Sequence, residues 1–143
     1  MRYVLMVSHG DFAEGLHSAV KMMTGERDDV LSIGLKDGMG TPEFAEKLKA
    51  IVSTLEVEDE IVLLADILSG SPFTTSLQVL DEAGFMDKTV VFAGMNMPLA
   101  ITAVLMKDNM DLESLKTTLV SEGKEGLLVY EPVIETDDNE DDI

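Results

Sequence analysis

The chain has 143 residues, a hydrophobic content of 45% and a formal net charge of −18. A chain of this length forms one domain and buries roughly 70% of the surface that its unfolded form exposes. It contains no cysteine, which excludes disulfides and thiolate chemistry, and its negative charge argues against binding to nucleic acid or to an anionic membrane surface.

The negative charge is densest at the C-terminus. Residues 131–143 carry seven acidic and no basic side chains, which leaves a charge of −11 on residues 1–130. We therefore expect one domain over residues 1–130 and an acidic, disordered tail over residues 131–143. The apolar runs are too short for a signal peptide or a membrane span, so a cytoplasmic protein is expected.

Strand and helix patterns alternate along the first 110 residues. The apolar run Tyr3-Val4-Leu5-Met6-Val7 is broken abruptly by Ser8-His9-Gly10, which is typical of a strand buried on both faces. A helical spacing of apolar residues follows, and the alternation then repeats. The sequence predicts strands over residues 3–7, 30–33, 61–65 and 89–93, and helices over 11–24, 41–55, 71–83, 98–107 and 111–121. In Thr41-Pro42 and Ser71-Pro72 the first residue is expected to cap its helix.

The C-terminal part departs from this alternation, because the last two predicted helices follow one another directly. We expect a turn at Gly123–Gly126 and a short strand at Leu127–Tyr130. That strand breaks the βα rhythm, so we expect it to lie antiparallel on an edge of the sheet, either in this chain or in a partner subunit.

The alternation predicts an α/β fold, a three-layer, doubly wound and mainly parallel sheet covered on both faces. With the strand order 2-1-3-4, the first and third strands are neighbours, and ligands bind where their carboxyl ends meet. His9 ends the first of these strands and Asp66 the third. A carboxylate beside an imidazole fixes the ring tautomer and leaves the other ring nitrogen as a nucleophile.

The start of the next helix supplies a third component. Ser69, Gly70, Ser71 and Phe73 are candidate phosphoryl-binding residues, because free backbone N–H groups and hydroxyls at a helix N-terminus bind anions. Taken singly, each of these groups is as typical of a cap or a turn. Together they suggest phosphoryl transfer through a phosphohistidine. His17 is interpreted as a surface residue, and no cofactor or metal motif is found.

Three segments resemble one known family. Val7-Ser8-His9-Gly10, Ala65–Phe73 and Ala93–Pro98, with the Gly123–Gly126 segment, are similar to the enzyme IIA component of the mannose-type (mannose/fructose/sorbose) bacterial sugar phosphotransferase system. The similarity covers about residues 1–130. This sequence differs from the family at Ser8, the position before His9, where threonine is the more familiar residue in the family.

The resemblance implies a phosphocarrier. His9 matches the histidine that accepts a phosphoryl group from phospho-HPr on Nε2 and transfers it to a IIB component during sugar uptake. Asp66 matches the carboxylate that orients the ring, and Ser71 the serine near the phosphoryl group. The family forms homodimers by exchanging the last strand, which Leu127–Tyr130 fits. IIB is expected to be a separate protein, and the membrane components IIC and IID to be reached only through it.

Other functions fit parts of the pattern. The phosphocarrier subunit of phosphoenolpyruvate-dependent dihydroxyacetone kinase has the same fold and histidine, but typically Gly-Ser-Ala where this chain has Gly70-Ser71-Pro72. A receiver domain would use Asp66 as acceptor and would need acidic Mg²⁺ ligands where His9 stands. A stand-alone regulatory domain that accepts a phosphoryl group without passing it on also remains open. The sequence leaves the sugar and the role of the tail undetermined.

Overall fold

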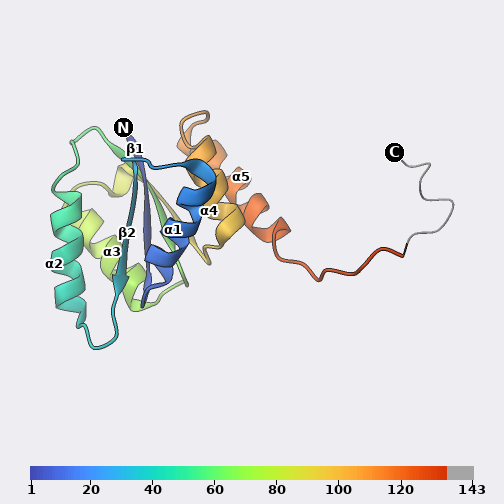
Figure 1. Ribbon diagram of the computed structural model, residues 1–143. Coiled ribbons are helices and arrows are strands. Elements are labelled where there is room, and N and C mark those ends of the chain that lie inside the picture. The colour runs from blue at the N-terminus through green and yellow to red at the C-terminus, as the bar shows by residue number, and fades with distance from the viewer. Residues whose placement is uncertain (135–143) are drawn as a thin grey trace.

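The computed structural model describes residues 1–134. Within that range four strands alternate with helices, and a last helix and an irregular segment follow (Figure 1). The strands are β1 (Arg2–His9), β2 (Val30–Leu35), β3 (Glu60–Ala65) and β4 (Thr89–Ala93). The α-helices are α1 (Phe12–Thr24), α2 (Thr41–Val52), α3 (Ser71–Glu82), α4 (Met97–Met106) and α5 (Leu112–Glu125), and a 3-10 turn, η1 (Met86–Lys88), precedes β4.

The sheet is parallel and has the order β2-β1-β3-β4, which confirms the predicted fold class and strand order. The first strand is therefore central. Val4 pairs with Val30 of β2 on one side and with Val62 of β3 on the other. This register also places His9 beside Leu35 and Val7 beside Ala65, so the three strands end at the same edge.

Two apolar clusters lie on opposite faces of the sheet, because successive strand residues point to opposite sides. Val4 and Met6 face the cluster under α1, α4 and α5, while Leu5 and Val7 face the cluster under α2 and α3. The ribbon shows the same three layers, with α2 and α3 on one side of the sheet and α1, α4 and α5 on the other (Figure 1). The predicted covering of both faces is thus observed.

Two helix starts differ from the prediction. Helices α2 and α3 begin at Thr41 and Ser71, and their N-caps are the preceding glycines, Gly40 and Gly70, in extended conformation. Neither helix has a side-chain cap, so the capping role predicted for Thr41 and Ser71 is wrong. In contrast, Asp111 caps α5 as expected, by accepting a hydrogen bond from the Ser114 N–H at 2.6 Å.

The C-terminal part also differs. Helix α5 continues to Glu125, through the turn predicted at Gly123–Gly126. A Cβ on Gly123 would lie 3.2 Å from the Leu99 side chain, and one on Gly126 would lie 2.5 Å from Pro98. The glycines therefore let the end of α5 approach α4 closely, and they do not break the helix.

The predicted strand at Leu127–Tyr130 is not formed within the single chain. These residues are exposed and lead the chain away from the body of the molecule (Figure 1). An antiparallel strand on this chain's own sheet edge is therefore wrong. Residues 131–134 are likewise exposed and irregular, whereas the rest of the predicted acidic tail lies outside the described residues.

Ionic groups gather at the amino edge of the sheet, opposite His9. Lys107, fully buried after α4, binds Asp29 at 2.7 Å, and Asp29 also accepts two hydrogen bonds from Arg27 at 3.0 Å. These cations hold the pKa of Asp29 at about 2, although its burial opposes them. The Arg2 guanidinium binds the Lys107 carbonyl and, at 2.6 Å, the Met110 carbonyl.

No helix within residues 1–134 combines the length and the apolar character that crossing a bilayer requires.

Candidate functional site

The His9 side chain stands at the carboxyl edge of the sheet because β1 ends in a turn at that residue. Gly10 has a φ of +56°, which favours glycine, and its N–H donates to the Leu35 carbonyl at 2.8 Å. The turn passes so close to β2 that a Cβ on Gly34 would lie 2.0 Å from the Gly10 carbonyl oxygen. Two glycines thus end the strand with the imidazole outside the core, where its side chain is 49% exposed.

Asp66 holds this imidazole in one orientation. The Asp66 Oδ2 atom lies 2.7 Å from His9 Nδ1 and accepts the His9 backbone N–H at 2.9 Å. The other carboxylate oxygen accepts the Ile67 N–H at 2.9 Å. A carboxylate cannot donate, so this contact selects the tautomer in which Nδ1 carries the proton and Nε2 the lone pair. Adjacent parallel strands bring these two side chains together across 57 positions of sequence.

The charge on Asp66 is stabilised by the same contacts. Its side chain is only 13% exposed, and this burial raises the pKa. Hydrogen bonds from the His9 N–H, the His9 ring and the Ile67 N–H more than offset the burial, so the pKa of Asp66 is lowered from its ordinary value. The group is therefore a carboxylate at neutral pH, which keeps the Nδ1 proton in place.

Helix α3 begins against the imidazole ring. A Cβ on Gly70 would lie 2.9 Å from His9 Cε1, so only glycine lets the helix start approach the ring this closely. Among the described residues, no protein oxygen accepts the backbone N–H groups of Gly70, Ser71 or Phe73. The helix therefore presents unused donors and the positive end of its dipole next to His9.

The four predicted phosphoryl-binding residues take different positions. Ser69 has a φ of +67°, a strained conformation for a residue with a Cβ, and together with Ser71 it is exposed. Their hydroxyls bond to no other described side chain or backbone group. The Phe73 side chain packs against the core under α2 and α3, so only its N–H is free to meet a ligand.

One charged group near this edge was missed by the sequence analysis. Lys36 directly follows β2, and its ammonium group binds Asp11 at 2.6 Å and also Glu14. These two carboxylates raise the pKa of Lys36. A signal was available, because the residue after β2 must lie at the same sheet edge as the residues after β1 and β3.

The second histidine is not part of this arrangement. His17 lies on α1 and is half-buried, not at the surface as predicted, with Nδ1 2.7 Å from the Ser32 hydroxyl of β2. Burial and the nearby Lys21 lower its pKa. Within residues 1–134 no three carboxylate or imidazole side chains converge on a point where they could hold a metal ion.

The fold and this edge of the sheet define a class of protein. It is a doubly wound α/β domain that presents an imidazole, oriented by a carboxylate, beside a helix start with unused N–H donors. Residues 3–120 match the model of the EIIA-man family, described as the PTS system fructose IIA component. The chain belongs to this family and is a component of a sugar phosphotransferase system, with a transferase role.

Individual relatives agree with this assignment. The chain is 26% identical over 116 residues to a PTS system fructose-specific EIIA component of Bacillus subtilis, covering 81% of this chain and 77% of the relative. It is also 26% identical to a PTS system mannose-specific EIIAB component of Escherichia coli, over 87% of this chain but only 38% of that protein's length. The crystal structure of the EIIA component from Streptococcus agalactiae has a TM-score of 0.77 and 27% identity, covering 90% and 97% of the two chains.

Proposed function

We propose that this protein carries phosphoryl groups on His9, accepting them from phospho-HPr and passing them to a IIB component. The observation that carries the proposal is the 2.7 Å contact between His9 Nδ1 and Asp66. It commits one ring nitrogen to the carboxylate and leaves Nε2 free, on a half-exposed ring, for an incoming phosphorus atom.

The transfer balances without a further reactant. The Nε2 lone pair of His9 attacks the phosphorus of the donor's phosphohistidine, the new P–N bond forms, and the bond to the donor nitrogen breaks with its electron pair. The Nδ1 proton stays between the ring and Asp66, whose negative charge stabilises the phosphorylated imidazole. In the second transfer a nucleophile of the IIB component attacks the phosphorus, the P–Nε2 bond breaks with its electron pair, and His9 returns to its starting state.

The start of α3 supplies the charge stabilisation that phosphoryl transfer needs. Within residues 1–134, the N–H groups of Gly70, Ser71 and Phe73 have no acceptor, and the hydroxyls of Ser69 and Ser71 are free to donate. We assign these groups to the equatorial phosphoryl oxygens. Because Ser71 does not cap its helix, its hydroxyl is available for this role.

We further propose that the protein works as a homodimer. The apolar segment Leu127–Tyr130 is exposed and is not part of the four-stranded sheet, while β4 is an edge strand. A groove of about 340 Å³ runs along that edge, lined by β4 and α5 residues such as Phe92 and Val120. A strand from a second copy would cover the groove and pair with the edge.

The direct test is phosphorylation with enzyme I, HPr and phosphoenolpyruvate, followed by mass mapping of the modified residue. We expect one phosphoryl group, on His9, with the acid lability and base stability of a phosphohistidine. His9→Gln should accept none and remain folded, whereas the matched variant His17→Gln should be phosphorylated normally. Phosphorylation of His9→Gln at the normal rate would exclude the proposed carrier.

The acceptor is tested separately. The phosphorylated protein is mixed with a mannose-type IIB protein or with the nucleotide-binding subunit of dihydroxyacetone kinase. Loss of the phosphoryl group to IIB alone is expected. Transfer to the kinase subunit alone would assign the protein to the kinase system, and transfer to neither would favour a regulatory acceptor.

A further inference from the structure

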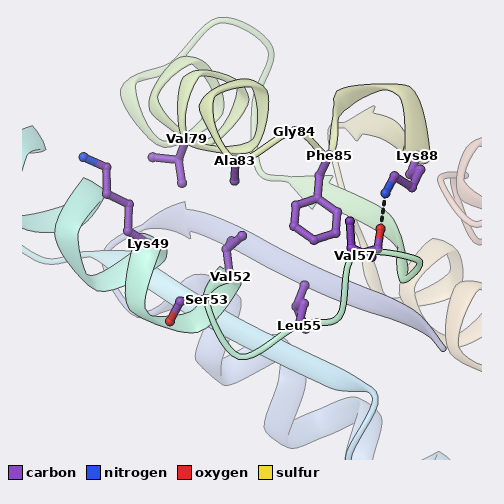
Figure 2. A pocket seen from close by; sticks show the side chains of 10 residues that line it. All are labelled: Lys49, Val52, Ser53, Leu55, Val57, Val79, Ala83, Gly84, Phe85 and Lys88. Atoms are coloured by element: carbon purple, nitrogen blue, oxygen red, sulfur yellow. Dashed lines mark hydrogen bonds between the residues drawn. The ribbon is translucent and has the colours of Figure 1, made fainter.

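A pocket of about 340 Å³ lies at the amino edge of the sheet, between the C-terminal ends of α2 and α3. Figure 2 shows Val52 from α2, Leu55 from the following loop and Phe85 from the segment after α3 directed into the same space. The volume lies within the range of small-molecule sites. The pocket is lined by Lys49, Val52, Ser53, Leu55, Val57, Val79, Ala83, Gly84, Phe85 and Lys88.

The lining combines apolar walls with two cations and no carboxylate. This is unusual in a chain with 28 acidic and 10 basic residues. Lys49, at one side, forms an exposed ion pair with Glu46 at 3.4 Å. Lys88, at the other side, forms no ion pair among residues 1–134, although Asp59 lies near enough for the charge of Lys88 to help lower the pKa of Asp59.

Lys88 is nevertheless held in a defined place. Its ammonium group donates to the Val57 carbonyl, the dashed bond in Figure 2, and lies 5.2 Å from the centre of the Phe85 ring. The carbonyl accepts only one of its three N–H groups. An anchored ammonium with unused donors, above an aromatic wall, is suited to an anion that carries an apolar body.

The net charge of the molecule narrows the choice of ligand. A small hydrophilic anion gains little here, because the surrounding negative charge of the protein repels it. An anion with an apolar body also removes from water the surfaces of Leu55, Val57 and Ala83, which are the exposed or half-exposed apolar side chains of the lining. We propose that this pocket binds a small organic carboxylate with an aromatic or branched aliphatic body, its carboxylate at Lys88.

The pocket and the candidate site lie at opposite ends of helix α3. Val79 lines the pocket from the last turn of α3 and Ala83 from the C-cap of the same helix, whose N-cap Gly70 lies against His9. The helix has 12 residues and is about 18 Å long. A ligand in the pocket therefore contacts one end of a rigid element whose other end contacts the imidazole.

The test is a titration of the ¹⁵N-labelled full chain with 1-naphthoate and with its uncharged counterpart, 1-naphthamide. We expect saturable amide shifts at Val52, Gly84 and Phe85, with naphthoate binding at least five-fold more tightly than naphthamide. Lys88→Met should remove most of this preference, since it keeps the apolar stem and deletes the charge. The matched control Lys47→Met, on an exposed face of α2, should bind as the original protein does.

A second variant covers the case in which Lys88→Met is unstable. Ala83→Phe, at an exposed residue of the lining, places a ring in the pocket and should abolish binding of both compounds. The proposal fails if neither compound shifts the pocket amides at millimolar concentration. It also fails if naphthoate and naphthamide bind the original protein equally, or if Ala83→Phe leaves their affinity unchanged.

Discussion

The two edges of the sheet use charged groups in opposite ways. At the amino edge, the fully buried Lys107 binds both Asp29 and Asp108, and Asp29 also accepts hydrogen bonds from Arg27. At the carboxyl edge, Asp66 is satisfied, but the His9 ring keeps a free nitrogen and is half-exposed. Charged groups that are paired with one another stabilise the fold. Polar groups that are exposed and lack a hydrogen-bond partner are available to a substrate. Four changes test this division, in order of decreasing effect.

Asp66→Asn tests the carboxyl edge directly. The amide keeps the shape of the side chain but loses the charge, and it is able to bind the wrong ring tautomer. By analogy with the orienting aspartate of serine proteases, phosphorylation by phospho-HPr should slow by about 10² to 10⁴-fold. Stability should change little. Stopped-time phosphorylation assays measure the rate, and Asp37→Asn, on an exposed loop at the same edge, is the control. A normal rate in Asp66→Asn would reduce Asp66 to a turn residue.

Asp29→Asn tests the amino edge and should have the reverse profile. It removes the negative charge between Arg27 and the buried Lys107 and leaves Lys107 with Asp108 as its one carboxylate partner within residues 1–134. Breaking a buried pair costs at most about 3 to 5 kcal/mol. The rate of phosphorylation per folded molecule should stay the same. Urea unfolding measures the loss, with the exposed neighbour Asp28→Asn as the control. A stability within experimental error of the original would mean that this network is dispensable.

Gly70→Ala sharpens the comparison by adding one methyl group at the carboxyl edge. The new Cβ would lie 2.9 Å from His9 Cε1 and 3.2 Å from the Ile67 side chain, so the ring must move. A displacement of this kind should slow phosphoryl transfer by about 10 to 100-fold. Gly15→Ala is the matched control, because nothing lies within 4 Å of the added atom. Equal rates for the two variants would show that the ring tolerates the displacement.

Acid should lower the stability of the protein by protonating Asp29 at the amino edge. Its folded pKa of about 2 lies below the ordinary value of 3.8, so its contribution is complete above about pH 4 and is lost as the pH falls toward 2. That contribution is on the order of 2 kcal/mol. The stability difference between the original protein and Asp29→Asn should therefore be constant from pH 7 to 4 and shrink between pH 4 and 2.5 in urea titrations. A difference that grows in acid would contradict the assigned pKa.

Much of the fold was predictable because its signals are local. Apolar runs ended by polar or glycine residues predicted all four strands, and their alternation with helices implied a parallel sheet. The proximity of His9 and Asp66 followed from the strand order alone. What local patterns could not predict were close approaches between distant segments. Gly123 was interpreted as part of a turn, because its contact with Leu99 depends on how α5 packs on α4.

In the candidate site, too, local sequence patterns could not predict the contacts between separate segments. That Gly70 contacts the His9 ring, and that Ser69 has a positive φ, depends on the conformation of one loop. The Ser-Pro pair suggested a capping serine, but the helix begins at Ser71 itself. The contacts of Lys36 with Asp11 and Glu14 join the loop after β2 to the start of α1, which the sequence analysis treated separately.

The central position of β1 has a consequence during synthesis. Both of its neighbours lie later in the chain, with Val4 paired to Val30 and to Val62. At about 5 to 20 residues per second, the ribosome needs roughly 3 to 12 s to make the residues between Val4 and Val62. During that time the apolar strand β1 has at most one of its two neighbouring strands. The sheet, and with it the His9–Asp66 contact, can form only if β3 is synthesised before the nascent chain associates with other molecules.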